Sequence, residues 1–543
     1  TNGGRIALRG RRRSCVTLLQ PMLLFLLLPL LLAIFAIAGK FFRGRGALTI
    51  LVAASIIFSA TQGVGFLVLT AASTAANYVL VAMLIKRSLP DRARVPLLAL
   101  GLVLNLLVLI LFKYAAWLQL LPGIGDISLA LSAMIPITLS FLTFQRCVAL
   151  LDAYSQPDLA RAGLEEAQPG AEPKLHLDRA LRYVGFVTLF PNLLIGPIAY
   201  LVEIAPQFAR NSFGRVRKLD LSIGGTLLAV GLFKKVVIAD PLGLVLVNPT
   251  FHALADTGPI NPVAAFLLVI SYFAQLYFDF SGYSDMVLGV ARMFGIRLPI
   301  NFDSPLRSVG IIDFYRRWHI TLTRVIARFL FAPLSIVGTR FVMRRKIKGV
   351  RAKLMSLWIP LLVNFVVIGL WHGPKETYLL FGLLHGLWYI CETEIRATKR
   401  WKNYRKATSD FQRTSLGLFI TLPPLMLTFS LFRSPDLITF GNLLASFTTN
   451  WRSPGGFSTI ATFTPMLGRL GLAYVIIFLA PNAYEMLGRY RPGIKSFNVG
   501  SNTLPWLAVR WRPNLLWGIF VAILSVLVLR GITQTIPFAY GMF

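Results

Sequence analysis

The sequence predicts an all-α protein that crosses a membrane many times, and three observations support this fold class. Hydrophobic residues make up 56% of the 543 residues and charged residues only 14%, whereas soluble proteins carry about 25% charged residues. The mean hydropathy is +0.67. Apolar stretches close to the length of a membrane-spanning helix, about 20 residues, recur along the whole chain. These features argue against a secreted domain, a cytosolic enzyme and a disordered chain.

The apolar stretches mark the elements that we expect to be helices. Several are shorter than a full span, or are interrupted by proline and glycine at 189–192, 195–197 and Pro333. Broken helices at membrane depth are stable only inside protein or beside a wet cavity. We therefore expect about 11–12 transmembrane helices plus re-entrant helices. The stretches lie near 17–38, 48–60, 62–85, 95–120, 129–151, 183–203, 223–247, 262–279, 283–295, 319–337, 355–371, 376–394, 414–433, 466–487 and 513–530.

The first helix follows a basic amino-terminal segment. Residues 1–15 contain five arginines and lead into an apolar run at 16–38. This run is longer than the apolar core of a signal peptide, which has about 7–15 residues. We expect an uncleaved helix whose amino end, residues 1–15, lies in the cytoplasm.

The remaining charges are strongly basic. Lys and Arg number 55 against 22 Asp and Glu, which gives a net charge of +33. The basic residues gather in short loops, as cytoplasmic loops against anionic membrane lipid do. This pattern predicts that nucleic acid is not a partner. The loops are interpreted as signals of membrane topology; the alternative is that some of them dock an acidic carrier protein or a CoA phosphate. The four most basic loops are 86–94, 209–218, 340–353 and 396–406.

Residues 152–182 break this pattern. They contain six acidic residues and three prolines, a composition typical of solvated chain. We expect a polar linker here, inside a single membrane domain that covers residues 1–543.

Two histidines in apolar surroundings are the main catalytic candidates, because ionisable groups are costly in membrane spans and mark functional sites there. His372 follows the apolar run 364–371, and Gly373 after it leaves room for a ligand. A neutral imidazole suits a general base that removes a proton from a hydroxyl. The alternative is a hydrogen-bonded histidine in helix packing, the role that we expect for His385.

His319 stands at the start of another apolar run. Asp313 and Arg317 before it are four residues apart, so on a helix they can form an ion pair. We interpret His319 as an imidazole at the mouth of a polar cavity. The alternative is an anchor at the membrane interface.

The run 278–285 places Asp279, Ser284 and Asp285 in apolar sequence. Buried carboxylates need partners, which nearby arginines such as Arg292, Arg297, Arg316 and Arg317 can supply. Two interpretations stay open: a buried ion-pair scaffold, and a wall of a substrate cavity. Motifs of P-loop ATPases, serine hydrolases and zinc proteases are absent from the sequence.

Taken together, these motifs resemble the membrane-bound O-acyltransferase family and, within it, the branch that acetylates bacterial polysaccharides. The strongest block, 277–334, contains FDFSGYSDM at 278–286 and FYRRWHITL at 314–322. A second block contains GLWHG at 369–373 and GLLHG at 382–386. Weaker similarities extend over most of the chain, at 135–145, 195–198, 231–240 and 536–543.

The resemblance implies helices around a central tunnel and transfer of an acyl group, acetyl in this branch, from a cytoplasmic thioester to a hydroxyl. It implies O-acetylation of an exported cell-surface polysaccharide with a periplasmic partner acyltransferase, in a bacterial inner membrane. It makes His372 the family's essential histidine and His319 its second motif histidine. No tightly bound cofactor or metal is expected; acetyl-CoA, or another thioester on an acyl carrier protein, is a substrate. The expected substrate-binding residues are Arg316, Arg317, Asp279, Ser284, Asp285, Trp371 and Asn301.

The sequence departs from the family pattern at Ala327-Arg328, where Arg-Asp is usual, and at the charged stretch 374–377. One alternative is transfer of D-alanyl or another acyl group to teichoic acid or a lipid-linked glycan. Two others belong to different classes: a secondary transporter or flippase, and a non-catalytic scaffold of an export complex. The histidine motifs argue against the last two.

Overall fold

The structure is a computed structural model that describes residues 21–114, 138–165, 175–192, 196–448, 455–494 and 509–536. Within these ranges the regular structure is helical, apart from an isolated bridge between Pro299 and Ile494. The all-α prediction is therefore confirmed. The basic segment 1–15 lies outside the described residues.

Seven helices in the described part of the chain are long and apolar enough to cross a membrane. Three shorter apolar helices accompany them, at Leu437–Ser446, Phe463–Leu479 and Leu515–Gly531. The chain is thus a multi-pass membrane protein. The seven are Leu23–Thr61, Val64–Leu84, Asp91–Lys113, Pro262–Met293, Ile320–Arg344, Gly349–His372 and Asp410–Arg433.

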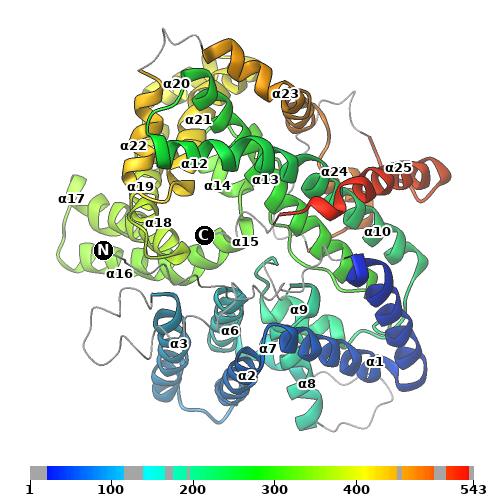
Figure 1. Cartoon of the computed structure of the whole chain (residues 1–543). Coiled ribbons are helices and arrows are strands. Elements are labelled where there is room, and N and C mark those ends of the chain that lie inside the picture. The colour runs from blue at the N-terminus through cyan, green and yellow to red at the C-terminus, as the bar shows by residue number, and fades with distance from the viewer. Residues whose placement is uncertain are drawn as a thin grey trace, which may run out of the picture.

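Four helices from the amino-terminal part of the chain, α1, α2, α3 and α6, form one side of the molecule. α1 (Leu28–Thr61) has non-helical backbone at Arg43, which explains the two apolar stretches in its sequence. α2 (Val64–Leu84), α3 (Asp91–Lys113) and α6 (Thr138–Ser155) lie side by side at the bottom of Figure 1. A reciprocal pair of amide hydrogen bonds between Asn77 and Asn105 joins α2 to α3. Such pairs satisfy amides that find no water in a bilayer.

Residues 152–182, the predicted polar linker, form helices over most of their described part. α6 ends at Ser155, α7 covers Pro157–Glu165 and α8 covers Leu175–Val187. Asp152 is fully buried, because it pairs with Arg328 at 3.3 Å. The composition indicated solvent exposure, which holds for Asp158, whose side chain is 81% exposed, but not for Asp152, whose partner lies far along the sequence.

α13 (Pro262–Met293) is the central helix, with 78% of its apolar window buried. It is one continuous helix where the sequence suggested two segments. α10 (Lys218–Leu232) packs along it at glycine contacts. A Cβ atom on Gly231 would lie 2.5 Å from the carbonyl oxygen of Gly282, so only glycine allows this approach.

The carboxyl half supplies the helices around the site. α14 (Ile311–Arg317) leads into α15 (Ile320–Ile326), a π-helical turn (Ala327–Phe331) and α16 (Ala332–Arg344). Pro333 follows that turn, so the predicted interruption is a local π-bulge within a continuous span. α18 (Ile359–His372) and α19 (Glu376–Ala397) pack together, and α21 (Asp410–Arg433) lies against α19 and α13.

The remaining elements are shorter or peripheral. The predicted break at 189–192 is confirmed: α8 ends at Val187 and a 3₁₀ turn covers Phe190–Asn192. The other helices are α9 (Leu201–Phe208), α11 (Asp240–Leu242), α12 (Asn248–Thr257), α17 (Gly349–Lys353), α20 (Lys399–Ala407), α22 (Leu437–Ser446), α23 (Gly455–Leu479), α24 (Ala483–Met486) and α25 (Leu515–Gly531). Further π turns cover Leu23–Leu27, Phe233–Ala239, Gly243–Val247 and Leu354–Trp358, and 3₁₀ turns cover Pro305–Arg307, Gly488–Tyr490 and Ile532–Gln534.

Candidate active site

His372 is the last residue of α18, and glycines explain how it is presented. Gly373 ends the helix with a φ of 152°. A Cβ on Gly369 would lie 2.2 Å from the carbonyl oxygen of Tyr378, and one on Gly382 would lie 2.5 Å from that of Phe365. The glycines of both histidine motifs therefore allow α18 and α19 to touch along their backbones.

His319 begins α15 in a left-handed conformation, with φ 45° and ψ 47°. A non-glycine residue is rarely stable there unless its surroundings hold it. Asn301 does so: its Oδ1 atom lies 3.0 Å from Nδ1 of His319 and also accepts from the Thr321 hydroxyl at 2.9 Å. Because Oδ1 can only accept, the hydrogen lies on Nδ1 of His319, and Nε2 keeps a lone pair.

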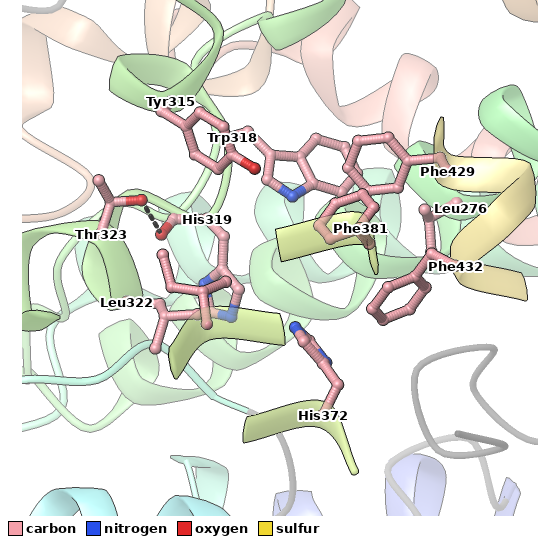
Figure 2. Close-up of a pocket in the computed structure, with 11 residues that line it drawn as sticks. Leu276, Tyr315, Trp318, His319, Leu322, Thr323, His372, Phe381, Phe429 and Phe432 are labelled. Carbon is pink, nitrogen blue, oxygen red and sulfur yellow. Dashed lines mark hydrogen bonds between the residues drawn. The ribbon is translucent and has the colours of Figure 1, made fainter. Parts of the chain in front are cut away.

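The two histidines line the same cavity, although 53 residues separate them in sequence. Figure 2 shows both imidazole rings pointing into this space, with aromatic rings around it. The cavity has a volume of about 40 Å³, enough for roughly three water molecules. Its other lining residues are mostly apolar: Leu276, Tyr315, Trp318, Leu322, Thr323, Ile368, Phe381, Phe429 and Phe432.

Aromatic contacts fix the walls of this cavity. The ring centroids of His372 and Phe432 are 4.6 Å apart in an edge-to-face arrangement, a preferred geometry for aromatic pairs. The Trp371 ring lies 4.8 Å from His372 and 6.2 Å from His319, so it stands beside both. Phe381, Phe429 and Phe432 were not singled out in the sequence, because apolar residues in an apolar helix carry no distinguishing signal.

His385 packs behind the cavity, in the structural role that we expected. Its Nδ1 atom lies 2.7 Å from the Tyr315 hydroxyl, and its Nε2 atom lies 2.8 Å from the Thr428 hydroxyl. Both ring nitrogens are therefore engaged, and the His385 side chain is fully buried. Tyr315, which also lines the cavity, was missed in the sequence because only its distant partner on α19 reveals its function.

Asp279 and Asp285 are paired with lysines, which corrects the expectation of arginine partners. Asp279 lies 2.5 Å from Nζ of Lys235, which also lies 2.7 Å from Asp240. Asp285 lies 2.6 Å from Nζ of Lys234. Neither aspartate lines the cavity. This geometry is that of a buried ion-pair scaffold between α13 and the π turn Phe233–Ala239.

The remaining predicted substrate-binding residues differ in how close they lie to the two histidines. Asn301 contacts His319 directly, and Ser284 lies 3.5 Å from the Asn301 amide nitrogen. Arg317 pairs with Asp313 at 2.9 Å, as their spacing predicted. Arg316 is exposed, and neither arginine lines the cavity. The structure therefore brings His319, His372, Trp371 and Asn301 together and leaves the two arginines outside.

This fold and site define a multi-pass membrane protein with two histidines that face one buried cavity. The sequence model of the membrane-bound O-acyltransferase family, MBOAT, matches residues 94–432. The chain belongs to this family, and it is an O-acyltransferase.

Two bacterial O-acetyltransferases are similar over most of the chain. A peptidoglycan O-acetyltransferase of Helicobacter pylori is 34% identical over 407 residues, 71% of each protein. A probable alginate O-acetylase, AlgI, of Pseudomonas aeruginosa is 32% identical over 406 residues, which are 73% of this chain and 70% of that protein. A teichoic acid D-alanyltransferase of Streptococcus thermophilus is 28% identical over 276 residues, 49% of this chain and 64% of that protein.

Proposed function

We propose that the protein transfers an acetyl group from a cytoplasmic thioester, acetyl-CoA or an acyl carrier protein, to a hydroxyl for O-acetylation of an exported cell-surface polysaccharide. The observation that carries this proposal is the small cavity that both His319 and His372 line. O-acetyltransferases of peptidoglycan and alginate are among the relatives, which supports a glycan acceptor. We place the reaction in a bacterial inner membrane, with a periplasmic partner acyltransferase.

The proposed reaction exchanges one acyl bond for another. His372 acts as general base and takes the proton of the acceptor hydroxyl while its oxygen attacks the thioester carbonyl carbon. The new C–O bond forms, the C–S bond breaks, and the proton passes to the departing thiolate. A general base is worth about 10²–10⁴ in rate. The reacting hydroxyl has one hydrogen, which goes to His372, so Nε2 of His319 accepts from a neighbouring hydroxyl of the acceptor and thereby orients it.

The apolar lining of the cavity favours acetyl over D-alanyl. An acetyl group carries no charge, which suits a cavity lined mostly by apolar side chains. A D-alanyl group is larger and carries an ammonium, and a charge is costly to bury beside phenylalanine rings without a partner. The D-alanyl alternative, supported by more distant relatives, is therefore our second candidate.

The test is transfer of radiolabelled acetyl from acetyl-CoA in proteoliposomes that hold a glycan acceptor. We compare the wild type with His372→Ala, His319→Ala and His252→Ala. His252 lies exposed on α12 and is the matched control. We expect loss of at least 100-fold for His372→Ala, a smaller loss for His319→Ala and full activity for His252→Ala. Equal transfer by the wild type and His372→Ala would contradict the proposal, provided that all variants elute as folded monodisperse protein.

A further inference from the structure

The backbone carbonyl groups at the carboxyl end of α18, the helix that carries His372, need hydrogen-bond donors. A helix leaves its last carbonyl groups without partners of their own, and a bilayer offers no water to satisfy them. In α18 these carbonyls belong to the turn just before His372. The carbonyl of Leu370 accepts one hydrogen bond at 3.0 Å from the backbone N–H of Gly373, which ends the helix, and a carbonyl oxygen has a second lone pair for a further donor. Whatever binds these carbonyls therefore controls where the imidazole of His372 points.

Two side chains from the end of α3 bind this turn. Nζ of Lys113 donates a hydrogen bond to the carbonyl oxygen of Trp371, and the hydroxyl of Tyr114 donates one to that of Leu370. Lys113 and Tyr114 are neighbours in sequence, and more than 250 residues separate them from their acceptors. A cation at a helix carboxyl end is also favoured by the helix dipole.

Lys113 makes two further contacts. Its Nζ atom lies 5.6 Å from the centroid of the Trp371 ring, within range of a cation–π interaction. It also lies 3.5 Å from the hydroxyl oxygen of Ser140 on α6. One ammonium group thus ties the ends of α3 and α6 to the turn that precedes His372.

We infer that Lys113 and Tyr114 are positioning residues that hold His372 in its reactive orientation. This inference rests on the proposed role of His372 as the base. Both hydrogen bonds end on backbone carbonyls, so they fix the course of the helix end itself. Misplacement of a catalytic group by about 1 Å can cost 10²-fold in rate.

The experiment compares kcat and KM of Lys113→Met, Lys113→Arg and Tyr114→Phe in the acetyl-transfer assay. Methionine keeps an apolar stem and removes the donors, whereas arginine keeps both the charge and the donors. We expect Lys113→Met to lower kcat about 100-fold with KM within about twofold of the wild type. Lys113→Arg should recover at least a tenth of the wild-type kcat. Tyr114→Phe, which loses one hydroxyl, should lower kcat about tenfold.

Two controls separate this inference from the proposed function. Lys86→Met removes an exposed lysine at the end of α2 and should leave kcat unchanged. His372→Ala is measured in parallel. If His372→Ala is fully active, the proposed function fails. If His372→Ala is inactive while Lys113→Met and Tyr114→Phe keep the wild-type kcat, only the positioning role fails. A rise in KM without loss of kcat in both variants would also overturn that role. If Lys113→Met does not fold, Tyr114→Phe and Lys113→Arg decide the question.

Discussion

Asn301 fixes the tautomer of His319. The Oδ1 atom of Asn301 lies 3.0 Å from Nδ1 of His319 and 2.9 Å from the hydroxyl of Thr321, and all three side chains are buried. Asn301 lies outside the RRWH motif, yet it determines which nitrogen of that motif's histidine faces the cavity. The left-handed backbone of His319 is held by the same contact.

Replacing Asn301 with alanine should therefore lower kcat by about 10–100-fold. The change leaves two buried donors without an acceptor, which costs about 1–3 kcal/mol, and it frees the imidazole to rotate. Ser284→Ala is the matched control, because its hydroxyl is 3.5 Å from the Asn301 amide and contributes little. Acetyl transfer and detergent thermal unfolding measure both effects. Wild-type kcat in Asn301→Ala would contradict this role.

Phe432 should limit the length of the transferred acyl chain. Its ring packs at 4.6 Å against His372 and closes the cavity on that side. Phe432→Ala should raise butyryl transfer relative to acetyl transfer at least tenfold, since truncating a buried ring creates new volume. The control is Phe419→Ala on the same helix, whose side chain is 77% exposed. An unchanged butyryl-to-acetyl ratio would show that another wall sets the limit.

The glycines at the contact between α10 and α13 should not tolerate replacement by a residue with a side chain. Gly231→Ala places a methyl group 2.5 Å from the carbonyl oxygen of Gly282, and such overpacking costs about 1–3 kcal/mol. Gly225→Ala, on the same helix, meets no atom within 4 Å and should stabilise the helix by up to about 1 kcal/mol. Opposite shifts of the unfolding temperature are therefore expected. A rise of the unfolding temperature for both variants would mean that helix propensity outweighs the contact.

The sequence was sufficient for features that depend on local spacing. Composition indicated the helical membrane fold, and the four-residue spacing of Asp313 and Arg317 predicted their ion pair. The partners of Asp279 and Asp285 were missed because Lys235 and Lys234 precede them by 44 and 51 residues, and no periodicity connects such pairs. Asp152 was assigned to solvent for the same reason: Arg328, a departure from the family pattern, lies 176 residues away.

The carboxyl group of Asp303 should make stability depend on pH. Asp303 lies in the loop after α13, and burial raises its pKa to about 6, against the opposing effect of the Arg317 guanidinium. The unfolded chain has the ordinary pKa of 3.8. Below pH 3.8 the carboxyl is protonated in both the folded and the unfolded state, so its stabilising contribution to the free energy of folding is fully present. As the pH rises from about 4 to 6, only the unfolded state releases the proton, so the contribution is lost.

Asp303→Asn should remove this loss, because an amide stays neutral at every pH. The amide oxygen can take the place of the Asp303 oxygen that lies 3.0 Å from the side-chain nitrogen of Asn482 and accept the same hydrogen bond. The wild type should lose up to about 3 kcal/mol of stability between pH 4 and pH 7 relative to the variant, at about 1.4 kcal/mol per pKa unit. Thermal unfolding in detergent at several pH values measures the difference, with Asp91→Asn at an exposed site as control. Parallel curves for the wild type and Asp303→Asn would show that Asp303 is ionised in the folded protein over this whole range, so that its pKa is not raised.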